Sequence, residues 1–160
     1  VHTMDRCFEK ISYEQFKKDI SNNRKLYDEY MLPERGSKYS AGYDFKAITD
    51  MIIKPGEILK IPTGYKARFL EDEMLMIVVR SSMGFKYNVR MCNQIGVIDS
   101  DYRGEIKVSL HNDSEKTRVI TPNQKIAQII IQPFLSVVFD EVDALDETNR
   151  GEGGFGSTGK

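Results

Sequence analysis

Cysteine and histidine are scarce in this chain of 160 residues, which has two of each. Cys7 and Cys92 lie far apart and form no Cys-x-x-Cys pair, so the sequence indicates neither a disulfide framework nor a zinc site. His2 and His111 likewise have no clustered partners with which to form a metal cage of side chains. Such sparse cysteine usage favours a reduced protein in a cytoplasmic or other intracellular compartment.

Long apolar runs and an excess charge of one sign are also missing. No apolar stretch approaches the roughly 18 residues of a membrane span, and no secretion signal is recognisable, so we expect no membrane association and an intracellular location. Lysine and arginine together number 23, against 24 acidic residues, and the formal net charge is −1. This balance argues against a nucleic-acid partner, although local basic groups can still hold a small anion.

The chain is long enough for one domain with a sizeable core, and 40% of its residues are hydrophobic. Short apolar or alternating runs follow one another from about residue 26, with turn signals about every eight to twelve residues. There is no strand–helix alternation and no internal repeat. The spacing predicts a mainly β fold, a jelly-roll-like β-barrel. Strands are expected at 51–53, 57–61, 65–69, 74–79, 89–92, 104–110, 117–120 and 126–131.

A short helix is expected before the barrel. Ser12 and Gln15 stand three residues apart, as in a capping box, and apolar residues such as Phe16 then recur at helical spacing. This pattern predicts a helix over roughly 13–21. We interpret it as a packing or partner-contact element outside the catalytic core.

These signals divide the chain into three parts. Residues 1–30 are expected to form an N-terminal extension with the short helix, and residues 31–147 the β-barrel core. Within that core the acidic stretch 140–147 is interpreted as an exposed tether, because runs of like charge are usually solvated. Residues 148–160 are expected to form a mobile C-terminal lid.

The C-terminal segment has an unusual mixture of residues. Five glycines in the ten positions 150–159 are set around Arg150, Phe155, Ser157 and Thr158. So many glycines do not suit a packed element, but their amides can approach an anion closely. The hydroxyls, the guanidinium and the aromatic ring add groups that suit a nucleoside triphosphate. A disordered tail is the alternative that this segment alone leaves open.

Four internal segments complete a pattern with this tail: 40–45, 80–84, 93–105 and 122–130. Each alone is compatible with an ordinary turn or strand end. Together, and in this order, they resemble the five sequence motifs of the homotrimeric dUTP diphosphatase (dUTPase) family, from about residue 32 to 159. The most specific are Gly-Val-Ile-Asp-Ser-Asp-Tyr-Arg-Gly at 96–104 and the glycine-rich segment at 150–159.

The resemblance implies an enzyme that hydrolyses dUTP to dUMP and pyrophosphate. It implies that Asp99 is the general base that activates a water for attack on the α-phosphorus. Tyr102 would pack against the deoxyribose and exclude a 2′-hydroxyl. Asn93 and the backbone as far as Ile98 would read the edge of uracil, which would reject cytosine.

The resemblance spreads the phosphate contacts over two motifs. Arg80 is expected to be a charge clamp and Ser81 to contact the phosphate chain, with Ser82 adding its amide. Gln128 is expected to contact phosphate and water. Asp44 is expected to have a structural role near the site. Mg²⁺ is implied as the cofactor, held mainly by substrate phosphates and waters with no direct protein ligand.

The same resemblance assigns the lid. Phe155 would stack on the uracil, and four residues would cap the γ-phosphate: Arg150, Gly156, Ser157 and Thr158. Closure would exclude water from the reaction. The family implies a homotrimer with shared active sites, in which the tail of one subunit crosses to the site of a neighbour.

Three positions depart from the family pattern: Ser82 and Asn123 stand where glycine is common, and Lys125 where arginine is usual. A dCTP deaminase, which shares the fold, would need a glutamate at the pyrimidine amino group, and Asp99 follows the dUTPase pattern instead. A nucleotide-gated switch is a second alternative, because a lid that orders around a ligand presents a new surface. An additional regulatory protein partner therefore stays open.

Overall fold

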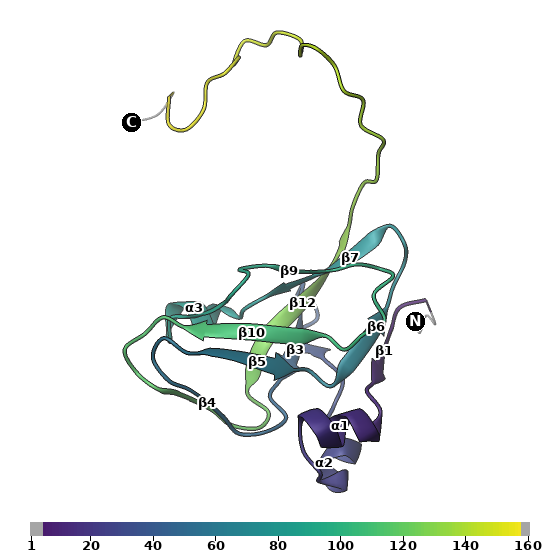
Figure 1. Cartoon of the computed structure of the whole chain (residues 1–160), viewed down its shortest axis with the longest axis vertical. Coiled ribbons are helices and arrows are strands. Elements are labelled where there is room, and N and C mark those ends of the chain that lie inside the picture. The colour runs from purple at the N-terminus through teal and green to yellow at the C-terminus, as the bar shows by residue number, and fades with distance from the viewer. Residues whose placement is uncertain (1–4, 158–160) are drawn as a thin grey trace.

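The computed structural model describes residues 5–157, and Thr158 of the predicted lid lies outside them. The described residues form a mainly β, jelly-roll-like fold with three short helices (Figure 1). The strands lie in every range where the sequence predicts one, so these predictions are confirmed. No helix in the described part of the chain is both long and apolar enough to cross a membrane.

Two sheets carry most of the fold, and their neighbouring strands are antiparallel. The larger has the order β2 (Glu34–Arg35), β3 (Tyr43–Lys46), β12 (Lys125–Pro133), β7 (Glu73–Val78) and β9 (Gly96–Ile98). The smaller has the order β5 (Ile58–Pro62), β10 (Lys107–Asn112) and β8 (Val89–Met91). Two further pairs are β1 (Cys7–Lys10) with β6 (Tyr65–Arg68), and β4 (Met51–Ile53) with β11 (Arg118–Ile120).

The core lies on the inward faces of these strands. Side chains alternate between the two faces of a strand, and β7 and β10 accordingly alternate between buried and more exposed positions. Leu75, Ile77, Val108 and Leu110 are at most 2% exposed. In β10 this alternation is already present in the sequence, whereas most residues of β7 are apolar and only the structure shows which of them face the core.

The N-terminal segment is packed onto the sheets. The predicted helix is α1 (Tyr13–Asp19), and its N-cap Ser12 accepts a hydrogen bond from the Gln15 amide at 3.1 Å. A second helix, α2 (Arg24–Glu29), and strand β1 were not predicted. Ile11 and Phe16 are fully buried, and β1 pairs with β6. The boundary between extension and core at residue 30 stays a prediction.

The C-terminal segment has a different character. The last strand, β12, ends at Pro133, and residues 134–157 contain no helix or strand. Figure 1 shows this segment leaving the sheets as a long arm. Its apolar residues are not sheltered, since Leu135, Val138 and Phe139 are at least 90% exposed.

Candidate functional site

A buried carboxylate organises the first cluster of predicted site residues. Asp44 on β3 is 6% exposed and lies opposite Gln128 on β12. Its Oδ1 is 3.1 Å from Arg80 Nε, and its Oδ2 is 3.3 Å from Lys125 Nζ. Both cationic side chains keep about a third of their surface exposed. The pairing therefore holds two positive charges at the surface in defined positions, which suits an anionic ligand.

Gln128 lies in the same cluster because two strands flank it, β3 through Asp44 and β7 through Val78. Its Nε2 donates to the carbonyl of Val79 at 3.4 Å. Gly42 approaches closely, since a Cβ at that position would lie 3.1 Å from both Cβ and Cδ of Gln128. The need for glycine at 42 is therefore steric.

The residues after β7 turn into a short helix, α3 (Ser81–Phe85), with Arg80 as its N-cap. Ser81 and Ser82 occupy the exposed first turn. The first amides of a helix have no partner within it. The structure thus brings Asp44, Arg80 and Gln128 together, with the two serines directly beyond Arg80.

A second cluster follows strand β9. Asn93 is exposed in the loop before that strand, and Ile98 at its end is half-buried against the core. Asp99 comes next and is exposed. Its carbonyl accepts a hydrogen bond from the Tyr102 amide at 3.1 Å, which closes a turn. The carboxylate predicted as the base therefore stands on an exposed turn at the end of a paired strand.

Tyr102 has a defined position in this turn. Its side chain is 44% exposed, and its hydroxyl donates to the carbonyl of Glu105 at 2.9 Å. Gly104 lies against the ring, because a Cβ there would come within 2.6 Å of Tyr102 Cζ. Any larger residue at 104 would displace the ring.

The two clusters lie at opposite ends of β7. Ile98 pairs with Leu75, so Asp99 lies beside Met74, whereas Arg80 follows the other end of the strand. Six residues of extended chain span about 20 Å. One copy of the chain therefore does not bring Asp99 and Arg80 to the same phosphate group.

The tail forms its own turns. Arg150 Nε donates to the carbonyl of Gly153 at 2.8 Å, and the Ser157 amide to the carbonyl of Gly154 at 2.9 Å. Phe155 is fully exposed, and Phe155 and Gly156 both have positive φ, at 52° and 85°. In this single chain the described lid residues, Arg150, Phe155, Gly156 and Ser157, lie on the arm and do not meet either cluster (Figure 1).

The sequence interpretation missed Glu105, which is 4% exposed. Burial raises the pKa of this carboxyl, although its hydrogen bond from the Gly64 amide partly lowers it. The sequence places this carboxylate directly after the motif at 96–104. It does not show that the carboxylate is buried, because the burial depends on residues that are distant in the sequence, such as Gln15 and Gly64.

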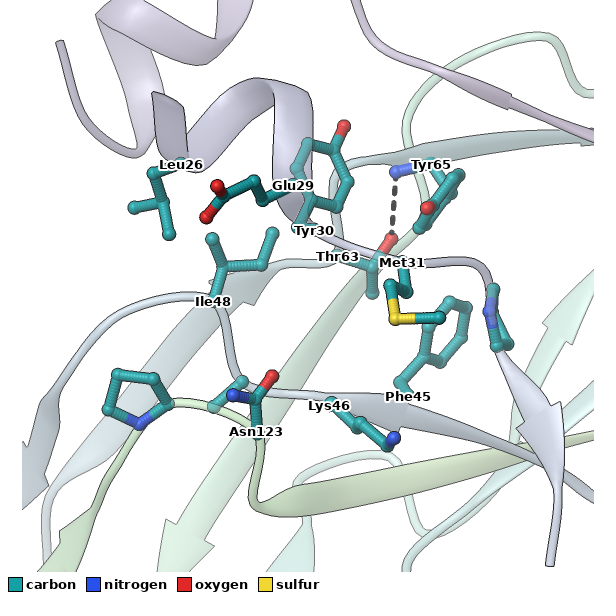
Figure 2. A pocket seen from close by; sticks show the side chains of 13 residues that line it. Leu26, Glu29, Tyr30, Met31, Phe45, Lys46, Ile48, Thr63, Tyr65 and Asn123 are labelled. Atoms are coloured by element: carbon teal, nitrogen blue, oxygen red, sulfur yellow. Dashed lines mark hydrogen bonds between the residues drawn. The ribbon is translucent and has the colours of Figure 1, made fainter. Parts of the chain in front are cut away.

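A cavity of about 250 Å³ was also missed. Figure 2 shows Tyr30, Thr63 and Tyr65 along one side of it, with Lys46 and Asn123 opposite. Burial raises the pKa of Tyr65 to about 12, so its phenol stays neutral. The cavity lies between the α2 segment and the sheets, and none of the described site residues predicted above lines it. It is therefore separate from both clusters.

Metal-binding side chains are not gathered in either cluster. Between residues 5 and 157, no three or more His, Cys, Asp or Glu side chains are grouped so that they could hold a metal ion. The donors near the two clusters are a guanidinium, an ammonium, hydroxyls, an amide and separated carboxylates. This set suits the phosphates of a metal–nucleotide complex better than a bare cation.

Comparisons with known proteins agree with these features. Residues 28–159 match the dUTPase family. A deoxyuridine 5′-triphosphate nucleotidohydrolase of Nautilia profundicola is 44% identical over 137 residues, which cover 86% of this chain and 96% of that protein. One of Hydrogenovibrio crunogenus is 45% identical over 140 residues, covering 84% and 91%.

Solved structures are similar as well. The dUTPase of Streptococcus mutans superposes with a TM-score of 0.67 at 30% identity, covering 82% of this chain and 98% of that one. The dUTPase of Staphylococcus bacteriophage 80alpha with dUPNHPP has a TM-score of 0.80 at 22% identity, covering 99% and 100%. At that identity the second likeness concerns the fold alone.

Proposed function

The chain belongs to the dUTPase family, and from this membership we propose that it hydrolyses dUTP to dUMP and pyrophosphate. The observation that carries the proposal is the turn after β9, where exposed Asp99 precedes a Tyr102 ring that lies against Gly104. Relatives at 44% and 45% identity named for this activity support it.

Asp99 is the proposed general base. Asp99 stands on an exposed turn, and an ionised carboxylate accepts a proton but cannot donate one. It would orient a water and take its proton as the water attacks the α-phosphorus. General-base assistance of this kind contributes about 10²–10⁴-fold to a rate. The remainder of the acceleration would come from positioning and charge stabilisation at the phosphates.

Tyr102 and the segment from Asn93 to Ile98 are the proposed nucleoside reader. The Tyr102 ring would pack against the sugar and leave no room for a 2′-hydroxyl. Backbone N–H and C=O groups beside Asn93 would match the polar edge of uracil. Sites that hydrogen-bond their substrate discriminate strongly, because the wrong base leaves buried polar groups unpaired.

Arg80, Ser81, Ser82 and Gln128 are the proposed phosphate contacts. The ion pair with Asp44 limits the freedom of the Arg80 guanidinium and leaves part of it exposed. A guanidinium presents several donors in a planar fork that fits phosphate oxygens. The backbone amides of Ser81 and Ser82 at the start of α3 would add neutral donors.

The family is consistent with a divalent cation, and we propose Mg²⁺, bound as part of the metal–dUTP substrate. The ion would be coordinated mainly by triphosphate oxygens and water, because Mg²⁺ retains waters and takes few protein ligands. When bound it would withdraw charge from the leaving pyrophosphate.

A homotrimer with shared sites is the proposed assembly. The separation of Asp99 and Arg80 along β7 supports it, since the two residues could act on one triphosphate only if different copies supply them. The arm supports it too, because exposed Leu135, Val138 and Phe139 are typical of a surface that a partner covers. Phe155, Arg150, Gly156, Ser157 and Thr158 would then reach the site of a neighbouring subunit.

The test is pyrophosphate release with Mg²⁺ from dUTP, UTP, dCTP and dTTP, for the intact chain and for Asp99→Asn. We expect rapid release from dUTP alone and its loss in the variant. Ammonia release from dCTP would identify a deaminase instead. Binding of dUTP without any hydrolysis would favour a nucleotide-gated switch and a regulatory protein partner.

A further inference from the structure

Glu105 is buried in hydrogen-bond contact with neutral donors. Its Oε2 accepts from the Gly64 amide at 3.0 Å, and its Oε1 accepts from Gln15 Nε2 at 3.3 Å. Burying a carboxylate is costly unless such bonds compensate it. Hydrogen bonds to a charged group are also stronger than those between neutral groups. The side chain of Glu105 is therefore tied firmly to two distant parts of the chain.

One of these parts is the N-terminal segment, residues 7–30. Gln15 lies on α1, where the sequence predicts that it belongs to a capping box. The backbone amide of Gln15 donates to the Ser12 hydroxyl, as the capping box predicts. The side-chain amide of Gln15 donates to Glu105 and does not turn back to the backbone of Ser12. The capping pattern thus identified the helix start but not the contact that this side chain makes.

The Gly64 turn connects to the same segment. The carbonyl of Gly64 accepts from the Tyr30 hydroxyl at 2.6 Å and from the Ile11 amide at 3.0 Å. Gly64 has a φ of 82°, and a Cβ there would lie 2.7 Å from the Tyr30 ring. Tyr30 also meets Tyr65, with ring centroids 5.2 Å apart (Figure 2). Both partners of the Glu105 carboxylate are therefore held by residues 7–30.

The backbone of Glu105 contacts Tyr102, which belongs to the proposed nucleoside reader. Its carbonyl accepts the Tyr102 hydroxyl at 2.9 Å, which sets the tilt of a ring that is 44% exposed. The next residue, Ile106, is bound to the strand beside Gly64, since its amide donates to the carbonyl of Tyr65 at 2.8 Å. A shift of residue 105 would therefore be transmitted to the Tyr102 ring.

We propose that Glu105 is a positioning residue, through which the N-terminal segment holds Tyr102 in the orientation that distinguishes a deoxyribonucleotide from a ribonucleotide. This inference rests on the proposed function of Tyr102 at the sugar. Glu105 is only 4% exposed, so its side chain would act through Tyr102 and not by contact with the substrate. Its effect concerns affinity and sugar selectivity more than the chemical step.

The first test compares sugar selectivity in Gln15→Ala and Glu105→Gln with that of the intact chain. The quantity measured is the ratio of kcat/KM for dUTP to kcat/KM for UTP. Losing a hydrogen bond worth about 1 kcal/mol corresponds to about a 5-fold fall in this ratio. We expect that fall to come from KM, with kcat nearly unchanged. An unchanged ratio in both variants would overturn the inference.

Two controls separate positioning from general destabilisation. Glu14→Ala changes the neighbouring position on α1, whose carboxylate pairs only locally with Lys17. Tyr27→Phe removes the hydrogen bond of 2.7 Å to the Ile11 carbonyl and so weakens the N-terminal segment without touching Glu105. Both should keep the selectivity ratio, even where Tyr27→Phe lowers the Tm. Equal losses of selectivity in Tyr27→Phe and Gln15→Ala would contradict a specific role for Glu105.

A double-mutant cycle tests the route through Tyr102. Interacting residues give non-additive effects, so Gln15→Ala should change selectivity little in a Tyr102→Phe background. Full additivity would exclude the hydroxyl of Tyr102 as the link.

Binding of α,β-imido-dUTP and α,β-imido-UTP, measured by calorimetry, gives the same comparison without turnover. An intact chain that binds the deoxy analogue selectively but releases no pyrophosphate would overturn the proposed hydrolysis alone. A hydrolytic chain whose Gln15→Ala and Glu105→Gln variants keep full selectivity would overturn the positioning role alone.

Discussion

Asp44 and Glu105 are both buried carboxylates, 6% and 4% exposed, yet their surroundings differ. Asp44 pairs with Arg80 and Lys125, whose charged ends reach the surface. Glu105 is bound by an amide of the backbone and by a glutamine. A buried carboxylate that meets cations can present positive charge to a ligand. One that meets neutral donors holds segments of chain together, and burial then raises its pKa because no cation among the described residues lies in hydrogen-bond contact to offset the loss of water.

Asp99 provides the contrast with both, because it is exposed and is proposed to act on the reacting water. Asp99→Asn should lower kcat by about 10²–10⁴-fold, since an amide cannot take the proton. Steady-state pyrophosphate release measures this, with urea unfolding as the check that the fold is retained. Asp101→Asn, an exposed neighbour in the same turn, should keep most of the activity. Equal losses in the two variants would remove the case for Asp99 as the base.

Removing the paired carboxylate should cost stability as well as affinity. In Asp44→Ala the free energy of unfolding should fall by about 3 kcal/mol, the lower end for a broken buried pair, because both cations can still reach water. Urea denaturation measures it, and KM for dUTP should rise as Arg80 loses its anchor. Asp28→Ala, which breaks the exposed pair with Arg24, should cost only about 0.5 kcal/mol. Similar losses of unfolding free energy in the two variants would mean that the burial of Asp44 does not strengthen its ion pairs.

The Tyr102 ring, which is bonded to the carbonyl of Glu105, can be displaced without changing the Glu105 carboxylate. In Gly104→Ala the new methyl group would collide with the Tyr102 ring and displace it. We expect kcat/KM for dUTP to fall about 10-fold or more, because small displacements at a site are costly. Steady-state kinetics measure this. Gly84→Ala, whose added Cβ meets nothing within 4 Å, is the matched control. Unchanged kinetics in Gly104→Ala would show that the ring position does not matter.

The smallest expected effect is the pH dependence that Glu105 adds. Burial is the largest cause of its raised pKa and Asp19 also raises it, while the Gly64 amide, Lys107 and Gln15 lower it. The folded chain therefore binds this proton at a higher pH than the unfolded chain. The associated stability is fully present below the unfolded pKa, near 4.5, and is lost as the pH rises through the folded value.

Urea unfolding at a series of pH values from about 4 upwards should reveal this loss, and Glu105→Gln should flatten it. Glu73 in the same chain should contribute a pH dependence of stability of the opposite sign. Its hydrogen bond with Arg6 lowers its pKa, so its contribution is present above the unfolded pKa and is lost as the pH falls. A Glu105→Gln profile with the slope of the intact chain would mean that Glu105 is not the group responsible.

The local patterns predicted much of this molecule. The apolar run at 74–79 and the segment 104–110 predicted strands, and the Ser12–Gln15 capping pattern predicted the start of α1. The resemblance of segments 40–45, 80–84 and 122–130 to family motifs implied that Asp44, Arg80 and Gln128 lie near one site, and in the structure Asp44 pairs with Arg80 and lies opposite Gln128. Each of these signals lies within a few consecutive residues, which is why the sequence alone contains it.

Other features depend on contacts between distant residues. β1 exists through its pairing with β6, about 60 positions away, and its four residues have no strong pattern of their own. Likewise, nothing near Gln15 reveals that its side chain reaches Glu105, which is 90 positions away. The separation of Asp99 from Arg80 depends on the register between β7 and β9.

The amino-acid sequence by itself determined the mainly β fold, the family and the types of chemical group available for a nucleotide, because periodicity and motif residues are local properties. Only the tertiary structure decided which carboxylate pairs with cations, which one is buried among neutral donors, and how far apart the proposed base and phosphate clamp lie. Those outcomes follow from burial and strand register, which arise only when distant segments pack against one another.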